Sequence, residues 1–292
     1  MIGPTADDSV ADSFAEHRGR LMAVAYRMLG SRADAEDAVQ ETWLRLAGQD
    51  PTSINNLAGW LTTVVGRVCI DVLRARKARP EDPLGDRLPD VMVMEDDDGP
   101  DDGVLRAESI GLALLVVLDT LRPTERLAFV LHDMFAVPFE EIGRIIDRSA
   151  DATKMLASRA RRKVRDTPRP NGDRRQQRAV VDAFLAAARE GDFEGLLRVL
   201  DPELSWRIYT PRGVQLRHGA NEVAARAQLG LRAQITARRV LVNGEPGIVA
   251  WAANGRPLGV MACTVVDDRI VNIISLASTE RLATLNLPGS PG

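Results

Sequence analysis

Residues 139–165 read FEEIGRIIDRSADATKMLASRARRKVR, and this stretch sets the organisation of the chain around it. Apolar residues at three- and four-residue steps predict a short helix over 139–146, whose inward side chains are Phe139, Ile142, Ile145 and Ile146. Ser149 follows three residues later as an N-cap for a longer helix that extends to about Arg165. A short helix, a tight turn and a longer helix predict a helix-turn-helix, whose second helix enters the major groove of DNA.

The longer helix of this pair divides into sets of side chains with different expected roles. Its first turns would face base edges with Ala150, Asp151, Thr153 and Lys154. Its later turns carry cations suited to phosphate contacts, namely Arg159, Arg161, Arg162, Lys163 and Arg165. Met155, Leu156 and Ala160 are expected to pack against the core. A surface helix in an ordinary bundle fits the same residues, so this stretch alone leaves that alternative open.

Further helices are predicted before this pair. Residues 108–121 form an apolar helix, and Pro123 suits the first turn of a next helix that runs to about Met134. We therefore expect residues 108–167 to form one helical domain.

The N-terminal segment also has helical periodicity. A helix over 14–29 would end at Gly30, and Ser31 would cap a second helix whose buried stripe is Ala35, Val39, Trp43 and Leu46. The other face of this second helix is acidic and amide-rich, with Asp34, Glu36, Asp37, Gln40 and Glu41. A solvated face is the plain interpretation of such a run.

A third helix, from about Leu57 to Arg79, is basic towards its end. Its cations are Arg67, Arg74, Arg76, Lys77 and Arg79. Basic residues at a helix C-terminus complement the helix dipole, but this number exceeds what capping needs. A surface that faces phosphates is therefore favoured.

An acidic stretch separates the two helical segments. Residues 80–104 contain ten Asp or Glu, one Arg, four prolines and three glycines. This composition buries too little apolar area to offset its ordering entropy, so residues 80–107 are expected to be a linker. A second break lies at 166–172, with two prolines and a glycine. The expected folded units are residues 10–79, 108–167 and 174–287.

Length and composition exclude several classes of protein. The chain has 292 residues, 27% of them charged, and a formal net charge of −3. It contains no apolar run of membrane-spanning length and does not begin like a signal peptide. Cys69 and Cys263 offer neither a disulfide framework nor metal-ligand spacing. We therefore expect a cytoplasmic protein with no membrane contact, no metal and no cofactor.

Residues 174–287 change from a helical to a strand period. A helix over 174–190 ends at Gly191, a short helix covers 192–200, and alternation begins near Leu204. After a helical stretch at 223–229, strands are expected at 238–242, 247–253, 258–266 and 269–276. Helices followed by an antiparallel meander predict an α+β domain, with helices covering one face of a curved sheet around a pocket.

The order of these units resembles the extracytoplasmic-function sigma factors of bacterial RNA polymerase. The resemblance rests on LMAVAYRMLG (21–30), ADAEDAVQETWL (33–44), GWLTTVVGRVCIDVLR (59–74), FVLHDMF (129–135) and PFEEI (138–142). It implies a multidomain protein with two all-α sigma domains, the second of which contains the helix-turn-helix. Core RNA polymerase, through its β′ clamp helices and β flap, and promoter DNA are the implied partners.

The resemblance also assigns residues to roles. Polymerase binding maps onto Asp34, Asp37, Gln40 and Trp43. Reading and melting of the minus-10 element map onto Asn55, Asn56, Trp60, Thr63, Arg67 and Arg74. The helix after the turn would read the minus-35 duplex with Ser149, Asp151, Thr153, Lys154, Ser158, Arg159 and Arg162. Many members carry Asn after the arginine at position 67, where this chain has Val68.

The third unit resembles the SnoaL-like domain of the nuclear-transport-factor-two-like superfamily, which is found at the C-terminus of one sigma-factor group that includes the J-type factors. VNGEPG (242–247) and GRPLG (255–259) agree with that group, whereas RLP (87–89), TPRG (210–213) and ASTERL (277–282) depart from its motifs. The pocket residues we expect are Trp206, Tyr209 and His218. Some free-standing domains of this fold are enzymes, but one histidine is a weak basis for catalysis, and a regulatory sensor for an unknown small molecule fits a DNA reader better.

The sequence thus predicts a sigma factor that binds core polymerase, reads minus-35 and minus-10 elements, is controlled in cis by its C-terminal domain, and is not an enzyme. A pocket enzyme with a vestigial DNA-binding region and a ligand-responsive DNA-binding regulator are the alternatives.

Overall fold

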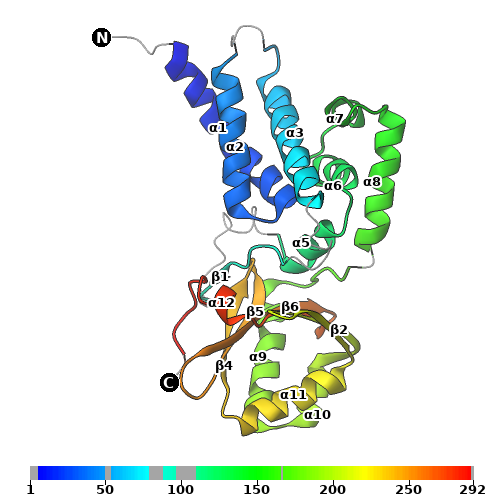
Figure 1. Ribbon diagram of the computed structural model, residues 1–292. Coiled ribbons are helices and arrows are strands. Elements are labelled where there is room, and N and C mark those ends of the chain that lie inside the picture. The colour runs from blue at the N-terminus through cyan, green and yellow to red at the C-terminus, as the bar shows by residue number, and fades with distance from the viewer. Residues whose placement is uncertain (1–5, 50–53, 79–87, 97–109, 166, 291–292) are drawn as a thin grey trace. The chain divides into compact units, whose positions relative to one another are not determined.

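The computed structural model describes residues 6–49, 54–78, 88–96, 110–165 and 167–290 (Figure 1). The chain divides into two compact units. The first comprises Met1–Asp90 and Val117–Asp166, and the second comprises Val91–Val116 and Thr167–Gly292. The two helical segments that the sequence suggested as separate units share the first of these, because their helices pack against each other.

Three helices begin the first unit, α1 (Ala6–Leu29), α2 (Arg32–Ala47) and α3 (Leu57–Lys77). Gly30 ends α1 with φ +67°, a left-handed conformation that favours glycine. Ser31 caps α2 as predicted, because its hydroxyl accepts a hydrogen bond from the Asp34 amide. Trp43 is only half-buried and contacts the ring of Phe14, with centroids 5.0 Å apart.

The second set of helices comprises α5 (Leu112–Asp119), α6 (Pro123–Phe129), the π-helical turn η2 (Val130–Met134), α7 (Phe139–Ile146) and α8 (Ala150–Arg165). The predicted helix-turn-helix is confirmed, with α7 and α8 as its two helices. Asp147 makes the turn with φ +54°. Gly143 permits it, since a Cβ there would lie 2.5 Å from the carbonyl oxygen of Arg148.

A buried arginine joins the two sets of helices within the first unit. Arg126 of α6 is 1% exposed. Its Nε donates to the carbonyl oxygen of Arg27 in α1 at 3.0 Å, and its Nη1 pairs with Asp119 of α5 at 3.1 Å. Burial lowers the pKa of Arg126 to about 10. Loss of Asp119 would leave the buried charge uncompensated, and the bond to the Arg27 carbonyl fixes how α1 and α6 meet.

The second unit contains α9 (Arg174–Glu190), α10 (Phe193–Val199) and α11 (Ala220–Arg232) beside a seven-stranded sheet (Figure 1). Its strands are the short β1 (Val93–Met94), β2 (Leu200–Thr210), β3 (Gly213–His218), β4 (Thr236–Val242), β5 (Glu245–Trp251), β6 (Pro257–Val266) and β7 (Arg269–Leu276). Their order is β1-β4-β5-β6-β7-β2-β3. The short helix α12 (Thr279–Leu282) follows β7.

The predicted meander is confirmed for β4 to β7, which pair antiparallel in sequence order. Asn243-Gly244 and Asp267-Asp268 form its tight turns, and all four residues have positive φ. Outside this meander the sheet is mixed, because β2 pairs parallel with β7. Strand β3, which was not predicted from the sequence, completes the edge beside β2.

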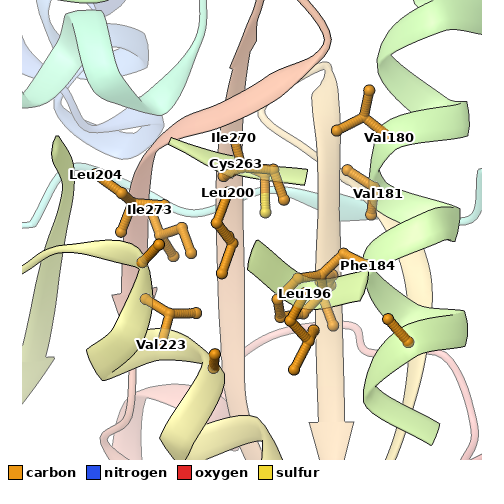
Figure 2. Packing of buried hydrophobic residues seen from close by; sticks show 14 of the residues in the cluster. Val180, Val181, Phe184, Leu196, Leu200, Leu204, Val223, Cys263, Ile270 and Ile273 are labelled. Carbon is orange, nitrogen blue, oxygen red and sulfur yellow. The ribbon is translucent and has the colours of Figure 1, made fainter. Parts of the chain in front are cut away.

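The core of the second unit lies between the sheet and its helices. Figure 2 shows Val181 and Phe184 of α9 pointing toward Cys263 and Ile270 of the strands. Gly191 ends α9 with φ +71°, as predicted. None of the helices in the described ranges is both long and apolar enough to cross a membrane.

Part of the acidic stretch is folded, which corrects the prediction that residues 80–107 form an unpacked linker. Leu88 and Val91 are buried, and β1 (Val93–Met94) adds to the edge of the sheet at β4. The carboxylate of Asp96 is fully buried between Arg178 and Arg239, at 2.5 and 2.6 Å. The buried apolar residues and the paired charge of Asp96 thus stabilise this folded part, although the stretch as a whole is polar. The remaining parts, residues 80–87 and 97–107, lie outside the described residues.

Candidate functional site

Helix α8 presents a continuous polar stripe on its outer face. Asp151, Lys154, Arg159 and Arg162 are exposed, and Ser158, between them on the same face, is half-buried. Ser149 is exposed at the start of the helix, where its hydroxyl accepts from the amide of Ala152 at 3.2 Å. Six of the seven residues predicted to face the minus-35 duplex therefore share one accessible surface.

Thr153 is the exception, and its predicted place among the DNA-facing residues is wrong. It is fully buried, and its hydroxyl donates to the carbonyl oxygen of Ser149 at 2.9 Å. Conversely, Met155 was expected to pack inward, but it is 55% exposed and lies beside Lys154 and Arg159 on the stripe. Arg161, expected to contact phosphates, pairs with Asp133 of η2 at 2.6 Å.

The residues predicted to read the minus-10 element follow α3 and the turn before it. Asn55, Asn56, Arg67 and Arg74 are exposed, whereas Trp60 and Thr63 are half-buried. Asn56 caps α3, with its side-chain oxygen accepting from the Gly59 amide at 3.0 Å. Arg74 lies 3.7 Å from Asp71 in an exposed ion pair, which contributes little to stability. The group therefore lies along one helix and its N-terminal turn.

Helix α7 packs against this same surface of α3. The Nη2 of Arg67 donates to the carbonyl oxygen of Arg144 in α7 at 3.1 Å. Gly66 of α3 lies close to α6 and α7, since a Cβ at this position would contact Leu127 of α6 and Ile145 of α7 at 3.4–3.5 Å. A small polar cleft of about 200 Å³ is lined by residues of both helices, including Arg67, Arg74 and Asp147. Val68, where many family members carry Asn, is buried.

The acidic face of α2 is largely accessible. Asp37 and Gln40 are exposed, while Asp34 is half-buried and forms an ion pair with Arg76 of α3. Leu44 is 58% exposed one helical turn beyond Gln40, so this face combines acidic, amide and apolar groups. Leu44 is not among the residues predicted from the sequence to bind polymerase.

The second unit contains an open cavity of about 510 Å³ between α9, α11 and the sheet. Its floor is apolar, with residues such as Phe184, Ile248, Cys263 and Ile273. Trp206 lines it, as predicted, and donates from Nε1 to the Ser275 hydroxyl at 2.7 Å. The predictions that Tyr209 and His218 line the cavity are wrong: Tyr209 is buried elsewhere in β2, and His218 is exposed at the end of β3.

Buried ionisable groups near the floor are not set up as nucleophiles. Burial raises the pKa of the Cys263 thiol to about 12, so this sulfur stays protonated. Burial also raises the pKa of the Glu245 carboxyl to about 7, but Glu245 is absent from the cavity lining. Across the described ranges, no cluster of three or more His, Cys, Asp or Glu could hold a metal ion.

Comparison with known families and proteins identifies the helical unit. The family model described as Sigma-70 region 2 matches residues 14–79, and the model described as Sigma-70, region 4 matches residues 111–164. The chain is 34% identical over 286 residues to a probable ECF RNA polymerase sigma factor, SigI of Mycobacterium tuberculosis. The aligned region covers 95% of this chain and 96% of SigI. The chain belongs to the extracytoplasmic-function sigma factor family.

The likeness to this family extends over the whole sigma factor. SigJ of the same organism, also an ECF RNA polymerase sigma factor, is 36% identical over 295 residues, or 94% of this chain and 92% of that one. The crystal structure of SigJ aligns with a TM-score of 0.71 at 33% identity, covering 95% of this chain and all of that chain. The sigma factor therefore combines two helical sigma regions with a C-terminal α+β SnoaL-like domain, and it directs promoter recognition by RNA polymerase.

Proposed function

We propose that α8 reads the minus-35 element as duplex DNA through its exposed stripe. Asp151, Lys154 and Ser158 would face base edges in the major groove, while Ser149, Arg159 and Arg162 would contact the backbone. The observation that carries the proposal is that these side chains share one accessible face of the second helix of a helix-turn-helix.

Helix α3 and the turn before it are proposed to hold the melted minus-10 element. Asn55, Asn56, Trp60 and Thr63 would contact unstacked bases, since an aromatic ring and amide groups suit single strands. Arg67 and Arg74 would contact phosphates. No covalent step takes place on the sigma factor.

The acidic face of α2 is proposed to bind the β′ clamp helices of core polymerase, and region 4 to bind the β flap. Asp37 and Gln40 support this role because they are exposed. Asp34 would contribute less directly, since it is paired with Arg76. Half-buried Trp43 would act by fixing α2 against α1 through its contact with Phe14.

Promoter binding requires the first unit to open. The positions that name the two promoter elements, minus-35 and minus-10, differ by 25 base pairs, roughly 85 Å at 3.4 Å per base pair. A compact unit of about 140 residues has a diameter on the order of 40 Å. Because α7 covers part of α3, we propose that this arrangement is a closed state, and that α3 and α7 separate when both elements are bound.

The C-terminal domain is proposed to bind a small molecule and to modulate the sigma factor in cis, as a sensor rather than an enzyme. A cavity of about 510 Å³ is of the size that encloses small ligands. Its described lining contains no Asp, Glu or His that could act as acid or base. We place this activity in the cytoplasm, where the polymerase works.

Runoff transcription tests the proposed function. Purified core polymerase and the full chain are incubated with the promoter region upstream of its own gene, and with a genomic promoter library. We expect a transcript that depends on both proteins. Failure to initiate on any promoter, together with no binding to core polymerase, would overturn the proposal.

A further inference from the structure

We infer that the cavity of the C-terminal domain takes an amphipathic carboxylic acid, with an aliphatic or aromatic body on the apolar floor and its carboxylate at two arginines of the rim. This inference rests on the proposed ligand-binding role and names the chemical class of the ligand. The floor of the cavity supports the apolar part. Leu185, Ile270 and Ile273 are buried, and Cys263 is a protonated thiol that behaves as a small apolar group.

The rim of the cavity supports the acidic part. Arg189 of α9 and Arg226 of α11 both line the cavity and are exposed, whereas the floor residues are buried. The described lining contains no acidic side chain, and Glu222, one turn before Arg226 and outside the lining, lies 3.5 Å from its guanidinium. The cavity therefore combines a neutral apolar interior with a cationic opening, which favours an anionic headgroup over a neutral or cationic one.

Both arginines keep donors available for a carboxylate. Arg189 uses Nη2 to donate to the carbonyl oxygen of Ala237 at 3.1 Å. Arg226 lies 3.5 Å from a carboxylate oxygen of Glu222, which has a closer partner in Arg217 at 2.5 Å. A guanidinium carries five N–H donors, so one such contact leaves most of them for a ligand.

Trp206 holds Arg226 at this opening. The guanidinium carbon of Arg226 lies 5.7 Å from the centre of the Trp206 ring, within the range of a cation–π contact. The indole is itself held by its hydrogen bond to Ser275. A ligand that enters would thus meet a positioned cation beside an aromatic wall, and the indole would report its arrival by fluorescence.

The test is a binding titration on the full chain with three probes that share one alkyl chain, namely dodecanoate, 1-dodecanol and dodecylammonium. We expect dodecanoate to bind at least tenfold more tightly than the other two, because charge-assisted hydrogen bonds are made only with the carboxylate. In a series of shorter fatty acids, each added CH₂ should raise the affinity about fourfold until the cavity is filled. Equal binding of all three probes, or of none, would overturn the inference.

Substitutions in and beside the cavity test whether the acid binds there. Arg226→Gln and Arg189→Gln should each remove most of the preference for dodecanoate over dodecanol, whereas Arg232→Gln should retain it. Arg232 is the matched control, since it is an exposed arginine of α11 that does not line the cavity. Ala227→Trp should abolish binding of every probe by filling the cavity. Unchanged binding in Ala227→Trp, or an equal loss in Arg232→Gln, would place the acid elsewhere and contradict the inference.

Parallel runoff assays, one without any probe and one with dodecanoate, separate this inference from the proposed function. If transcription proceeds but no acid binds, the inference about the ligand fails and the sigma function stands. If dodecanoate binds as expected but neither raises nor lowers transcription, the ligand class stands and control in cis fails.

Discussion

The two proposed DNA-reading surfaces, on α8 and on α3, lie in one compact unit but differ in how accessible they are. On α8, the polar stripe from Asp151 to Arg162 is open. On α3, Arg67 is bonded to the backbone of α7, and Gly66 allows α7 to approach closely. The surface on α8 is thus open to duplex DNA along its length, whereas α7 occupies part of the surface on α3 at Arg67. Under the proposed roles, this difference would separate recognition of the minus-35 element from melting at the minus-10 element.

The largest effect is expected from reversing the charge of the open surface. Lys154→Glu combined with Arg159→Glu should lower promoter-dependent transcription by at least 100-fold, because phosphate attraction becomes repulsion. The melting temperature should stay unchanged, since both side chains are exposed. Runoff transcription and thermal unfolding measure the two effects.

Arg198→Glu combined with Arg232→Glu is the matched control, because it makes the same charge change on exposed residues of the C-terminal domain. An equal loss of transcription in this control would mean that net charge, not the α8 surface, is responsible.

A second, smaller effect is expected from forcing the covered surface open. Gly66→Leu places a bulky side chain against Leu127 and Ile145, and such overpacking costs about 1–3 kcal/mol. The open fraction of the free protein should therefore rise by about tenfold, and the apparent affinity for core polymerase and promoter should rise with it. Affinity is measured by fluorescence anisotropy of a labelled promoter fragment.

Gly66→Ala separates this effect from a general change in α3. Its methyl would make ordinary contacts at 3.4–3.5 Å and improve helix propensity by up to about 1 kcal/mol, so it should raise stability without opening the unit. If Gly66→Leu leaves affinity unchanged while destabilising the protein, the covering of α3 has no role in promoter binding.

A smaller effect on minus-35 binding is expected from Met155 on the open surface of α8. An exposed thioether amid polar groups suits contact with the C5-methyl of thymine. Replacing one thymine of the minus-35 duplex by deoxyuridine should weaken binding by the full chain about fourfold, the value of one buried methyl group. Met155→Ala should be insensitive to that replacement. Equal sensitivity of both proteins at every thymine would remove Met155 from the recognition surface.

The smallest effect is expected at Thr153. Thr153→Val should change promoter affinity by less than about twofold, because the residue lies on the buried face of α8. It should lower the unfolding free energy by about 1 kcal/mol through loss of the bond to the Ser149 carbonyl. An altered base preference at the minus-35 element, measured by selection from a randomised duplex, would contradict this placement.

Local patterns in the sequence predicted much of the fold. The caps at Gly30, Ser31 and Gly191, the bounds of α7 and α8, and the turn at Asn243-Gly244 all follow from the conformational needs of single residues. The phase of α8 does not follow from residue types alone, because a threonine can be buried once its hydroxyl bonds to the preceding turn. Thr153 therefore lies inside and Met155 outside.

Contacts between residues far apart in the sequence could not be predicted from such local patterns. The parallel pairing of β2 with β7 joins residues about 70 positions apart, and nothing in either strand specifies its partner. The folded part of the acidic stretch depends on Arg178 and Arg239, which lie far along the chain from Asp96. Likewise, Tyr209 and His218 are near Trp206 in sequence, yet strand alternation and the end of β3 direct them away from the cavity.

A distance measurement between α3 and α7 tests the central claim most directly. Nitroxide labels at Lys77→Cys and Glu140→Cys are suitable, because both positions are exposed and the native Cys69 and Cys263 are buried. Pulsed electron resonance should give a short, narrow distribution for the free protein, and one longer by several tens of Å in the complex with core polymerase and promoter. The same distribution in the free protein and in a transcribing complex would contradict the account.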